Sequence, residues 1–194
     1  TATGDDDGGS RAGACYLVCL NDDGTAKDIK KISDIHGGFK GDIDPYDYFG
    51  YTQNIGDINS DGIDDLAISA PKDDDGGIDR GAVWICFMNE DGTVASEQKI
   101  SDTIGGFTGI LEDTDLFGHR ILSIDDINGD GINELVVSSF NDDDGVTDGG
   151  AIWILYLKSD GTVDSYDKIS CNDSILINEV EYYDRFLTGL DYFG

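Results

Sequence analysis

Basic residues are scarce in this sequence. Its 12 lysines and arginines stand against 41 aspartates and glutamates, which gives a formal net charge of −29. Binding to a phosphate backbone requires a basic surface, so this balance excludes nucleic acid as a partner, and it also disfavours an anionic membrane surface. A folded chain of such charge must tolerate strong self-repulsion or bind cations that offset it, and this favours calcium.

Long apolar runs are also missing. The longest, 82–88 and 151–157, are far shorter than the ~20 residues that a membrane helix needs, so membrane insertion is excluded. Two histidines, and four cysteines without a Cys-x-x-Cys pair, do not predict a zinc site. The chain starts at Thr1 without a signal-peptide pattern, which leaves either a removed leader or a longer parent chain.

What the sequence does contain is a repeat of 68 to 69 residues. Four kinds of landmark recur in register. They are the Asp-rich segments at 5–9, 73–77 and 142–145, the Asp-Gly-Thr turns at 23–25, 91–93 and 160–162, the Lys-Ile-Ser triplets at 31–33, 99–101 and 168–170, and the Phe-Gly pairs at 49–50, 117–118 and 193–194. An insertion between Cys171 and Leu190 delays the last Phe-Gly pair.

Each repeat has the pattern of four strands. In the second repeat we expect strands over 51–58, 66–70, 81–88 and 94–100, with a hairpin turn at Asp91-Gly92. The third of these is apolar without alternation, which is typical of a strand covered on both faces. Four strands in which the inner ones are buried on both faces describe a blade of a β-propeller.

We therefore predict an all-β fold of β-propeller blades, each a four-stranded antiparallel sheet, with about two full blades and partial blades at both ends. The expected units are 1–48 (the C-terminal half of a blade and an inter-blade loop), 49–116 and 117–170 (two full blades), and 171–194 (an insertion and the start of a further blade). Propellers close with 4–8 blades. Either the chain is part of a longer polypeptide, or copies of it polymerise head to tail and cover one another's open sheets.

Two Asp/Asn/Gly loops, 57–65 and 126–134, have the spacing of calcium loops. Calcium prefers six to eight oxygen ligands, and a glycine at position 6 lets the chain curl so that positions 1, 3, 5, 7 and 9 converge. The predicted ligands of about two Ca²⁺ ions are Asp57, Asn59, Asp61, the Ile63 carbonyl and Asp65 in the first loop, and Asp126, Asn128, Asp130, the Ile132 carbonyl and Glu134 in the second.

An EF-hand is excluded for both loops. It requires Glu at position 12, where this sequence has Ile68 and Val137, and each loop is followed by a short β-like run instead of a helix. The alternative interpretation is that both loops are Asx-type turns between strands. Two loops in register in a chain of charge −29 favour calcium over that alternative.

These residues resemble the FG-GAP repeats of integrin α-chain propellers. Phe49-Gly50 and Phe117-Gly118 match the Phe-Gly of the family, and the two loops match its Asp-x-Asp-x-Asp-Gly-x-x-Asp pattern with Asn at position 3. Ser69-Ala70-Pro71 stands where Gly-Ala-Pro is usual, and 138–140 departs further. The resemblance implies a propeller with calcium between the first and second strands of each blade, in a secreted or cell-surface protein.

The predicted function is that of a non-enzymatic, calcium-binding extracellular repeat protein that serves adhesion or structural assembly. No GxSxG, HExxH or phosphate-loop motif is present. The alternative is a lectin-like propeller that binds glycans through exposed aromatic residues, for which the candidates are Tyr46, Tyr48, Tyr182 and Tyr183. The expected partners are therefore other copies, further blades, glycans or cell-surface proteins, and the sequon at Asn172 gives weak support for secretion.

Three further features stay open at this stage. The Asp triplets at 73–75 and 142–144 are either cation or partner sites or solvated acidic loops. Trp84 and Trp153 share one register position and are more typical of an inter-blade core than of a sugar site.

The cysteines allow one disulfide hypothesis. Cys15 and Cys19 lie too far apart on one strand to be bonded to each other. Either of them could face Cys86 across two blades, or all could be buried thiols.

Overall fold

The computed structural model describes residues 1–173, which form ten β-strands and no helix. The strands are β1 (Ala14–Leu20), β2 (Ala26–Ser33), β3 (Tyr51–Gly56), β4 (Asp65–Ala70), β5 (Ala82–Met88), β6 (Val94–Ile100), β7 (Phe117–Ile124), β8 (Glu134–Ser139), β9 (Ala151–Leu157) and β10 (Val163–Ser170). Within this part of the chain no helix is long and apolar enough to cross a membrane.

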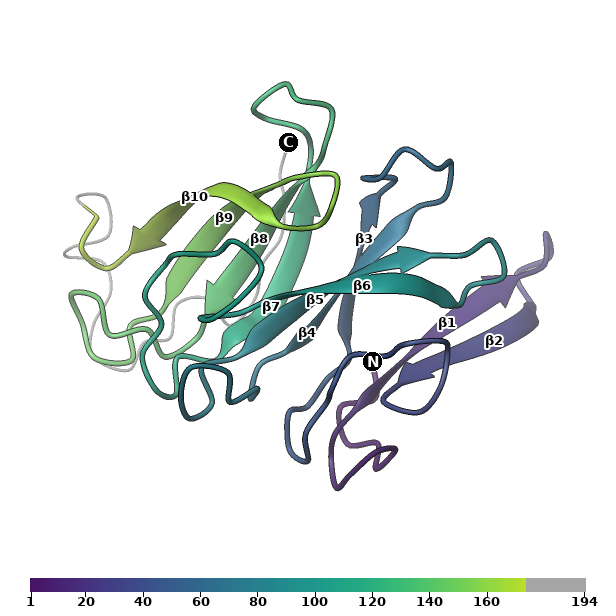
Figure 1. Cartoon of the computed structure of the whole chain (residues 1–194), viewed down its shortest axis with the longest axis horizontal. Coiled ribbons are helices and arrows are strands. Elements are labelled where there is room, and N and C mark those ends of the chain that lie inside the picture. Colours follow the sequence, from purple (N-terminus) through teal and green to yellow (C-terminus); the bar gives the residue numbers. More distant parts are fainter. Residues whose placement is uncertain (174–194) are drawn as a thin grey trace.

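The strands form three antiparallel sheets that follow one another along the molecule (Figure 1). β1 pairs with β2, and two four-stranded sheets have the orders β3-β4-β5-β6 and β7-β8-β9-β10. β3 and β7, the first strands of the two four-stranded sheets, contact each other. The prediction of an all-β fold of four-stranded antiparallel blades is confirmed.

Strand ends differ from expectation by two residues where glycine bends the chain. β3 ends at Gly56 and not at residue 58, because Gly56 has φ 78° and its N–H is held by the Asn54 side chain at 2.8 Å. β1 begins at Ala14, directly after Gly13, which has φ 101°. Both conformations are ones that glycine adopts at low steric cost.

Two hydrophobic clusters fill the spaces between the sheets. One joins the β1-β2 sheet to the second sheet and contains Trp84, and the other joins the second sheet to the third and contains Trp153. The two indoles are 6% and 2% exposed, and each has a phenylalanine ring edge-on at 5.1 Å, from Phe39 and Phe107 respectively. Both tryptophans are therefore core residues, as their position in apolar strands predicts.

A backbone seam joins each blade to the next. The N–H of Phe49 donates to the Ala12 carbonyl at 2.8 Å, and the N–H of Phe117 donates to the Arg80 carbonyl at 2.9 Å. Both phenylalanine side chains are fully buried in the clusters just described. The Phe-Gly pairs at 49–50 and 117–118 thus each place one side chain in the core and one N–H on the preceding blade.

The seam also explains a glycine in the preceding blade. A Cβ at Gly13 would lie 2.1 Å from the Phe49 carbonyl oxygen, and a Cβ at Gly81 would lie 2.1 Å from that of Phe117. No real Cβ approaches a backbone oxygen so closely, so the seam requires glycine at both positions.

The predicted disulfide is not formed, because Cys15, Cys19 and Cys86 are free thiols. Cys15 and Cys86 share one buried cluster across the two blades, as the buried-thiol alternative predicts, whereas Cys19 is exposed. Burial raises the pKa of Cys15 and of Cys86, which keeps both in the thiol form.

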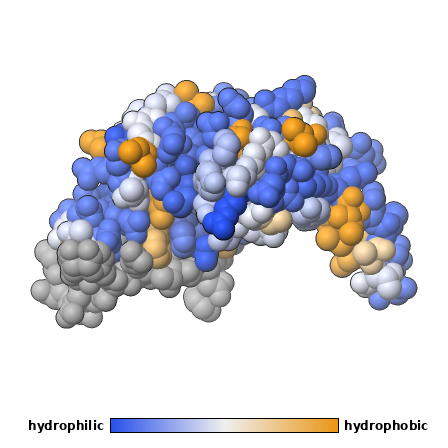
Figure 2. Space-filling model, turned by 90° about the horizontal axis from the view of Figure 1, so that it is seen from below, coloured by the Kyte–Doolittle hydropathy of each residue, from blue (hydrophilic) through white to orange (hydrophobic). Residues whose placement is uncertain are grey.

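The face shown in Figure 2 is mainly hydrophilic, as expected from the net charge. An exception is the end of the molecule formed by β1 and β2, where apolar side chains gather. Tyr16, Val18 and Leu20 on β1 and Ile29 on β2 are 42 to 61% exposed. The aligned side chains in β5, namely Trp84, Cys86 and Met88, are buried against the preceding blade.

The two repeats differ in one buried hydrogen bond, and this gives a test of the core. The Trp153 indole N–H donates to the Ser139 hydroxyl at 2.9 Å, whereas the Trp84 indole nitrogen is buried without a partner because Ala70 stands at the position of Ser139. We expect Ala70→Ser to stabilise the protein by about 1 kcal/mol and Ser139→Ala to destabilise it by a similar amount.

Urea unfolding measures both effects, with Ala67→Ser as the matched control. Ala67 is equally buried in β4 but lies in the other cluster, so its hydroxyl gains no indole partner and should destabilise by about 1 kcal/mol. A loss of stability in Ala70→Ser as large as in the control would contradict this account.

Candidate functional site

The first loop, 57–65, links β3 to β4 and is closed by its own carboxylates. The two Asp57 oxygens accept the N–H groups of Asp61 and Gly62 at 3.0 and 2.8 Å. Asp65, at the start of β4, is fully buried and accepts the N–H groups of Ile58 and Met88. Burial raises the pKa of Asp65, which is a physical reason for a cation to be favourable beside it.

The second loop, 126–134, repeats this arrangement with one informative difference. Asp126 accepts the N–H groups of Gly129, Asp130 and Gly131, and the Gly131 bond is the main cause of its lowered pKa. Glu134 is 1% exposed, and its Oε2 accepts the Ile127 N–H at 2.8 Å. Its other oxygen, Oε1, is buried without a hydrogen-bond partner.

The structure therefore places positions 1, 3, 5 and 9 of both predicted sites within compact loops. Asn59 and Asn128 each accept an N–H and donate to the carboxylate of Asp61 or Asp130. Residues 1–173 contain no group of three or more His, Cys, Asp or Glu side chains gathered as a metal cluster. An unsatisfied buried carboxylate oxygen costs about 1–3 kcal/mol, and a calcium ion would satisfy that of Glu134.

The Asp triplets have a role that the sequence did not reveal. Their first and third carboxylates hold the lysine of the Lys-Ile-Ser triplet in the same blade, with Lys99 at 2.7 Å from Asp73 and Asp75. Lys168 lies 2.7 Å from Asp142 and 2.5 Å from Asp144, and Lys31 is held in the same way by Asp5 and Asp7. We call this arrangement the lysine clamp.

The lysine clamp corrects the interpretation of the first aspartate of each triplet. Asp73 and Asp142 are 3% exposed and are paired with an ammonium group. Asp74, Asp143 and Asp144 are exposed, as expected of a solvated acidic loop. Burial alone would lower the pKa of Lys99 and Lys168, but the hydrogen bonds that each ammonium donates to its two carboxylates outweigh it and raise the pKa of both. Each ammonium also lies over the indole of its blade, at 5.3 Å from Trp84 and 4.6 Å from Trp153.

A third carboxyl group, from the inter-blade loop, lies beside the lysine clamps of Lys99 and Lys168. Asp47 and Asp115 are 4% and 3% exposed, and each accepts one N–H at 2.9 Å, from Asp44 and Glu112 respectively. Burial, together with the charge of Asp73 or Asp142 beside them, raises the pKa of both to about 7. Around neutral pH each of these two carboxyl groups is therefore protonated in only part of the molecules.

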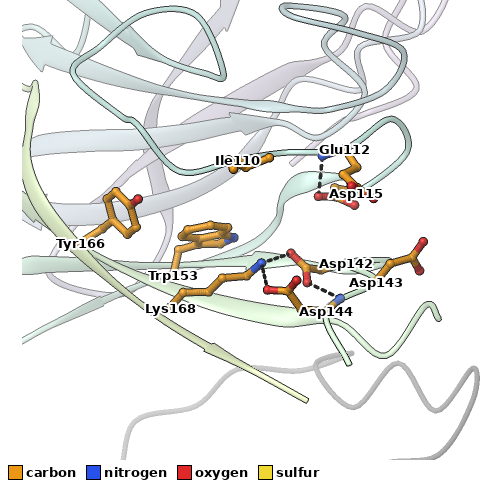
Figure 3. A pocket seen from close by; sticks show the side chains of 9 residues that line it. All are labelled: Ile110, Glu112, Asp115, Asp142, Asp143, Asp144, Trp153, Tyr166 and Lys168. Carbon is orange, nitrogen blue, oxygen red and sulfur yellow. Dashed lines mark hydrogen bonds and ion pairs between the residues drawn. The ribbon is translucent and has the colours of Figure 1, made fainter. Parts of the chain in front are cut away.

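Figure 3 shows this arrangement in the third sheet, around a cavity of about 430 Å³. Asp115 approaches from the inter-blade loop, whereas Lys168, Asp142 and Asp144 come from the blade below it. Ile110, Trp153 and Tyr166 form the apolar wall.

The exposed aromatic residues of the lectin alternative are only partly described. Tyr46 is 55% exposed in the inter-blade loop, and Tyr48 is half-buried against Arg11. Tyr182 and Tyr183 lie outside the described residues, as do the insertion and the Phe-Gly pair at 193–194. Asn172 of the sequon is exposed.

Comparison with known proteins agrees with the repeat. Residues 49–86 and 117–155 match the FG-GAP repeat, and each match begins at a phenylalanine of the seam. Integrin alpha-4 of Xenopus laevis is 34% identical over 100 residues, which are 50% of this chain and 9% of that protein. Integrin alpha-PS5 of Drosophila melanogaster is 33% identical over 112 residues, 57% of this chain and 10% of that protein.

A relative of another kind matches as well. Phosphatidylinositol-glycan-specific phospholipase D of Rattus norvegicus is 30% identical over 130 residues, 66% of this chain and 14% of that protein. The chain thus spans about a tenth of the length of the curated relatives it matches.

The buried carboxyl groups predict an unusual pH dependence. Asp115 binds its proton more tightly when folded, so its contribution to stability is present below the unfolded pKa of ~4 and is lost as the pH rises through about 7. We expect the stability of Asp115→Asn relative to the wild type to rise by about 2–3 kcal/mol between pH 5 and pH 8.

Thermal unfolding between pH 5 and pH 8 tests this expectation. Asp47→Asn should behave in the same way, because Asp47 has the same surroundings. Asp22→Asn, an equal change of charge at an exposed turn, is the control and should shift stability equally at both pH values. A constant difference between Asp115→Asn and the wild type would contradict the assignment.

Proposed function

We propose that this chain, which carries two FG-GAP repeats like those of integrin alpha chains, is a non-enzymatic, calcium-binding propeller segment of an extracellular or cell-surface protein that serves adhesion or structural assembly. The observation that carries calcium binding is the pair of loops in register, one of which holds a buried carboxylate oxygen without a partner. Adhesion is supported by the similarity to integrin alpha chains.

The residues of both loops fit calcium by their chemistry. Asp57, Asn59, Asp61, the Ile63 carbonyl and Asp65 would hold one ion through oxygen alone. The matching residues of 126–134 would hold the other, with Glu134 Oε1 as the oxygen that has no other partner. A bound ion would supply positive charge between carboxylates that repel one another and would fix the turn between the first two strands of each blade.

A non-enzymatic role is supported by the sites themselves. The carboxylates at these sites close loops, as Asp57 and Asp126 do, or hold lysines, as Asp73 and Asp142 do, and both are structural roles. The similarity to a phospholipase D covers 14% of that protein and does not carry its activity to this chain.

The apolar face of β1 and β2 supports association with a further blade. Tyr16, Val18 and Leu20 occupy the strand positions that pack against a neighbouring sheet in β5. A blade of another copy or of a longer polypeptide would bury this face in the same way.

Removal of calcium should destabilise the protein strongly. With two sites and millimolar calcium, we expect chelator to lower the melting temperature by about 10 °C, because each ion binds only the folded chain. Calorimetry with calcium and with chelator measures the shift, and the double variant Asp57→Asn with Asp126→Asn should lose most of it.

The exposed-turn variant Asp22→Asn is the control for charge, and it should keep the full calcium response. A melting temperature that chelator leaves unchanged would overturn the calcium assignment. An undiminished response in the double variant would place the ions elsewhere.

Association through the β1-β2 face is tested by sedimentation velocity in millimolar calcium. We expect self-association that depends on concentration and that Val18→Lys weakens by about tenfold, because the substitution places a charge in the apolar face. A single species near 20.8 kDa would rule out the polymer and assign the face to a blade of a longer polypeptide.

A further inference from the structure

Free positive charge is rare on this protein and is unevenly placed. Most lysines and arginines of the described part have a carboxylate at ion-pair distance. The exceptions within residues 1–173 are Arg11, Lys27, Lys40 and Arg120. In a chain of net charge −29, an arginine without a carboxylate partner needs a specific explanation.

The two unpaired arginines contact tyrosines instead. Arg11 donates from Nη1 to the Tyr48 hydroxyl at 2.8 Å, with its guanidinium carbon 5.9 Å from the ring centre. The Lys72 ammonium lies 5.9 Å from the centre of the same ring. Arg120 lies over Tyr51, with 4.8 Å from its guanidinium carbon to the ring centre. The two tyrosine rings thus gather three cations, of which Arg11 and Arg120 have no carboxylate partner.

These two tyrosines line a cavity of about 220 Å³ between the inter-blade loops and strands β3 and β7. The rest of its wall is formed by Thr3, Pro71, Lys72, Leu116 and His119. Most of this wall is ring, proline and leucine surface, so the cavity is apolar inside and cationic at its edge. We call it the tyrosine pocket.

Backbone hydrogen bonds next to the seam fix the shape of the tyrosine pocket. Tyr48 and Leu116 both have φ 57°, a left-handed conformation that is rare for residues other than glycine. Their N–H groups donate to the carbonyls of Arg11 and Asp79 in the preceding blade, each at 3.2 Å. Strained backbone that the surroundings fix in this way is common at ligand clamps.

The charge at the edge remains positive near neutral pH. Lys72 is paired with Asp79 at 2.7 Å, whereas Arg11 and Arg120 are not paired. Burial, together with the charge of Arg120, lowers the pKa of His119 to about 4, so His119 adds no charge but an apolar face.

We propose that the tyrosine pocket binds an acidic peptide segment of a partner protein. An aliphatic or aromatic side chain of the segment enters the cavity, and a neighbouring carboxylate pairs with Arg11 or Arg120 at its edge. Complementary charge carries this choice, because the pocket is a positive site on a strongly acidic surface. The inference deepens the proposed adhesion function, on which it rests for its choice of a protein partner.

A carbohydrate is less suited to the same pocket. Sugar hydroxyls need several hydrogen-bonding groups, and the Tyr48 hydroxyl is already engaged by Arg11. A sialylated glycan shares the carboxylate of the proposed segment but would leave its hydroxyls against proline, leucine and ring surface. It therefore serves as the competing probe in the experiment.

The experiment is an NMR titration of the labelled chain with two capped tetrapeptides, Asp-Phe-Asp-Leu and its amide counterpart Asn-Phe-Asn-Leu. We expect the acidic peptide to shift the backbone amides of Tyr48, Tyr51 and Leu116. It should bind at least about tenfold more tightly than the amide peptide, and added salt should weaken it. The double variant Arg11→Gln with Arg120→Gln should reduce this affinity by about tenfold, with an unchanged melting temperature.

Lys40→Gln is the matched control, because Lys40 is exposed, unpaired and not part of the pocket. Arg120→Lys keeps the charge and should retain most of the affinity. It provides the comparison in case the double variant alters folding. The proposal is overturned by equal binding of the two peptides, by no shifts at roughly 10 mM peptide, or by sialyllactose shifting the same amides instead. A calcium response that persists alongside any of these results leaves the calcium assignment standing.

Discussion

The backbone seam between blades is the constraint on which the rest of this structure depends. At each described junction a phenylalanine N–H donates to the preceding blade, and a glycine there makes room for the phenylalanine carbonyl. The seam fixes where Phe49 and Phe117 enter the core, and so which faces of the sheets meet. It also fixes the inter-blade loops that bring Asp47 and Asp115 to the lysine clamps.

Negative charge is offset in different ways at the two ends of the strands. At the end with the inter-blade loops, carboxylates are buried against lysine, indole and one another, so ammonium groups and protons neutralise them. At the other end, the loops after β3 and β7 contain no lysine, and their carboxylates accept backbone N–H groups. A divalent cation would offset the charge at that end, because the two loops themselves contain no basic side chain.

Much of the architecture could be predicted from the sequence because it depends on local periodicity. The apolar run at 82–88 and the Asp-Gly turns define strands and hairpins without reference to distant residues. The lysine clamps could not be predicted in this way, because Lys99 and Asp73 are distant in sequence and meet only once β4, β5 and β6 are paired. The aligned recurrence of Lys-Ile-Ser with each Asp triplet was the available signal. The missing partner of Glu134 Oε1 and the unpaired state of Arg11 and Arg120 depend on tertiary contacts, and no pattern in the sequence indicates them.

The seam also orders the events of folding. Within a blade every strand pairs with the next one along the chain, so the sheets form from contacts that are close in sequence and should form quickly. The seam bond from Phe49 to Ala12 closes a much longer loop and cannot form until the next blade has begun. During synthesis we therefore expect the β1-β2 sheet and the β3-β4-β5-β6 sheet to lack this junction until Phe49 or Phe117, respectively, has left the ribosome. Until then the apolar face of that sheet is exposed. Protection from misassembly therefore depends on formation of the junction and not on completion of the blade alone.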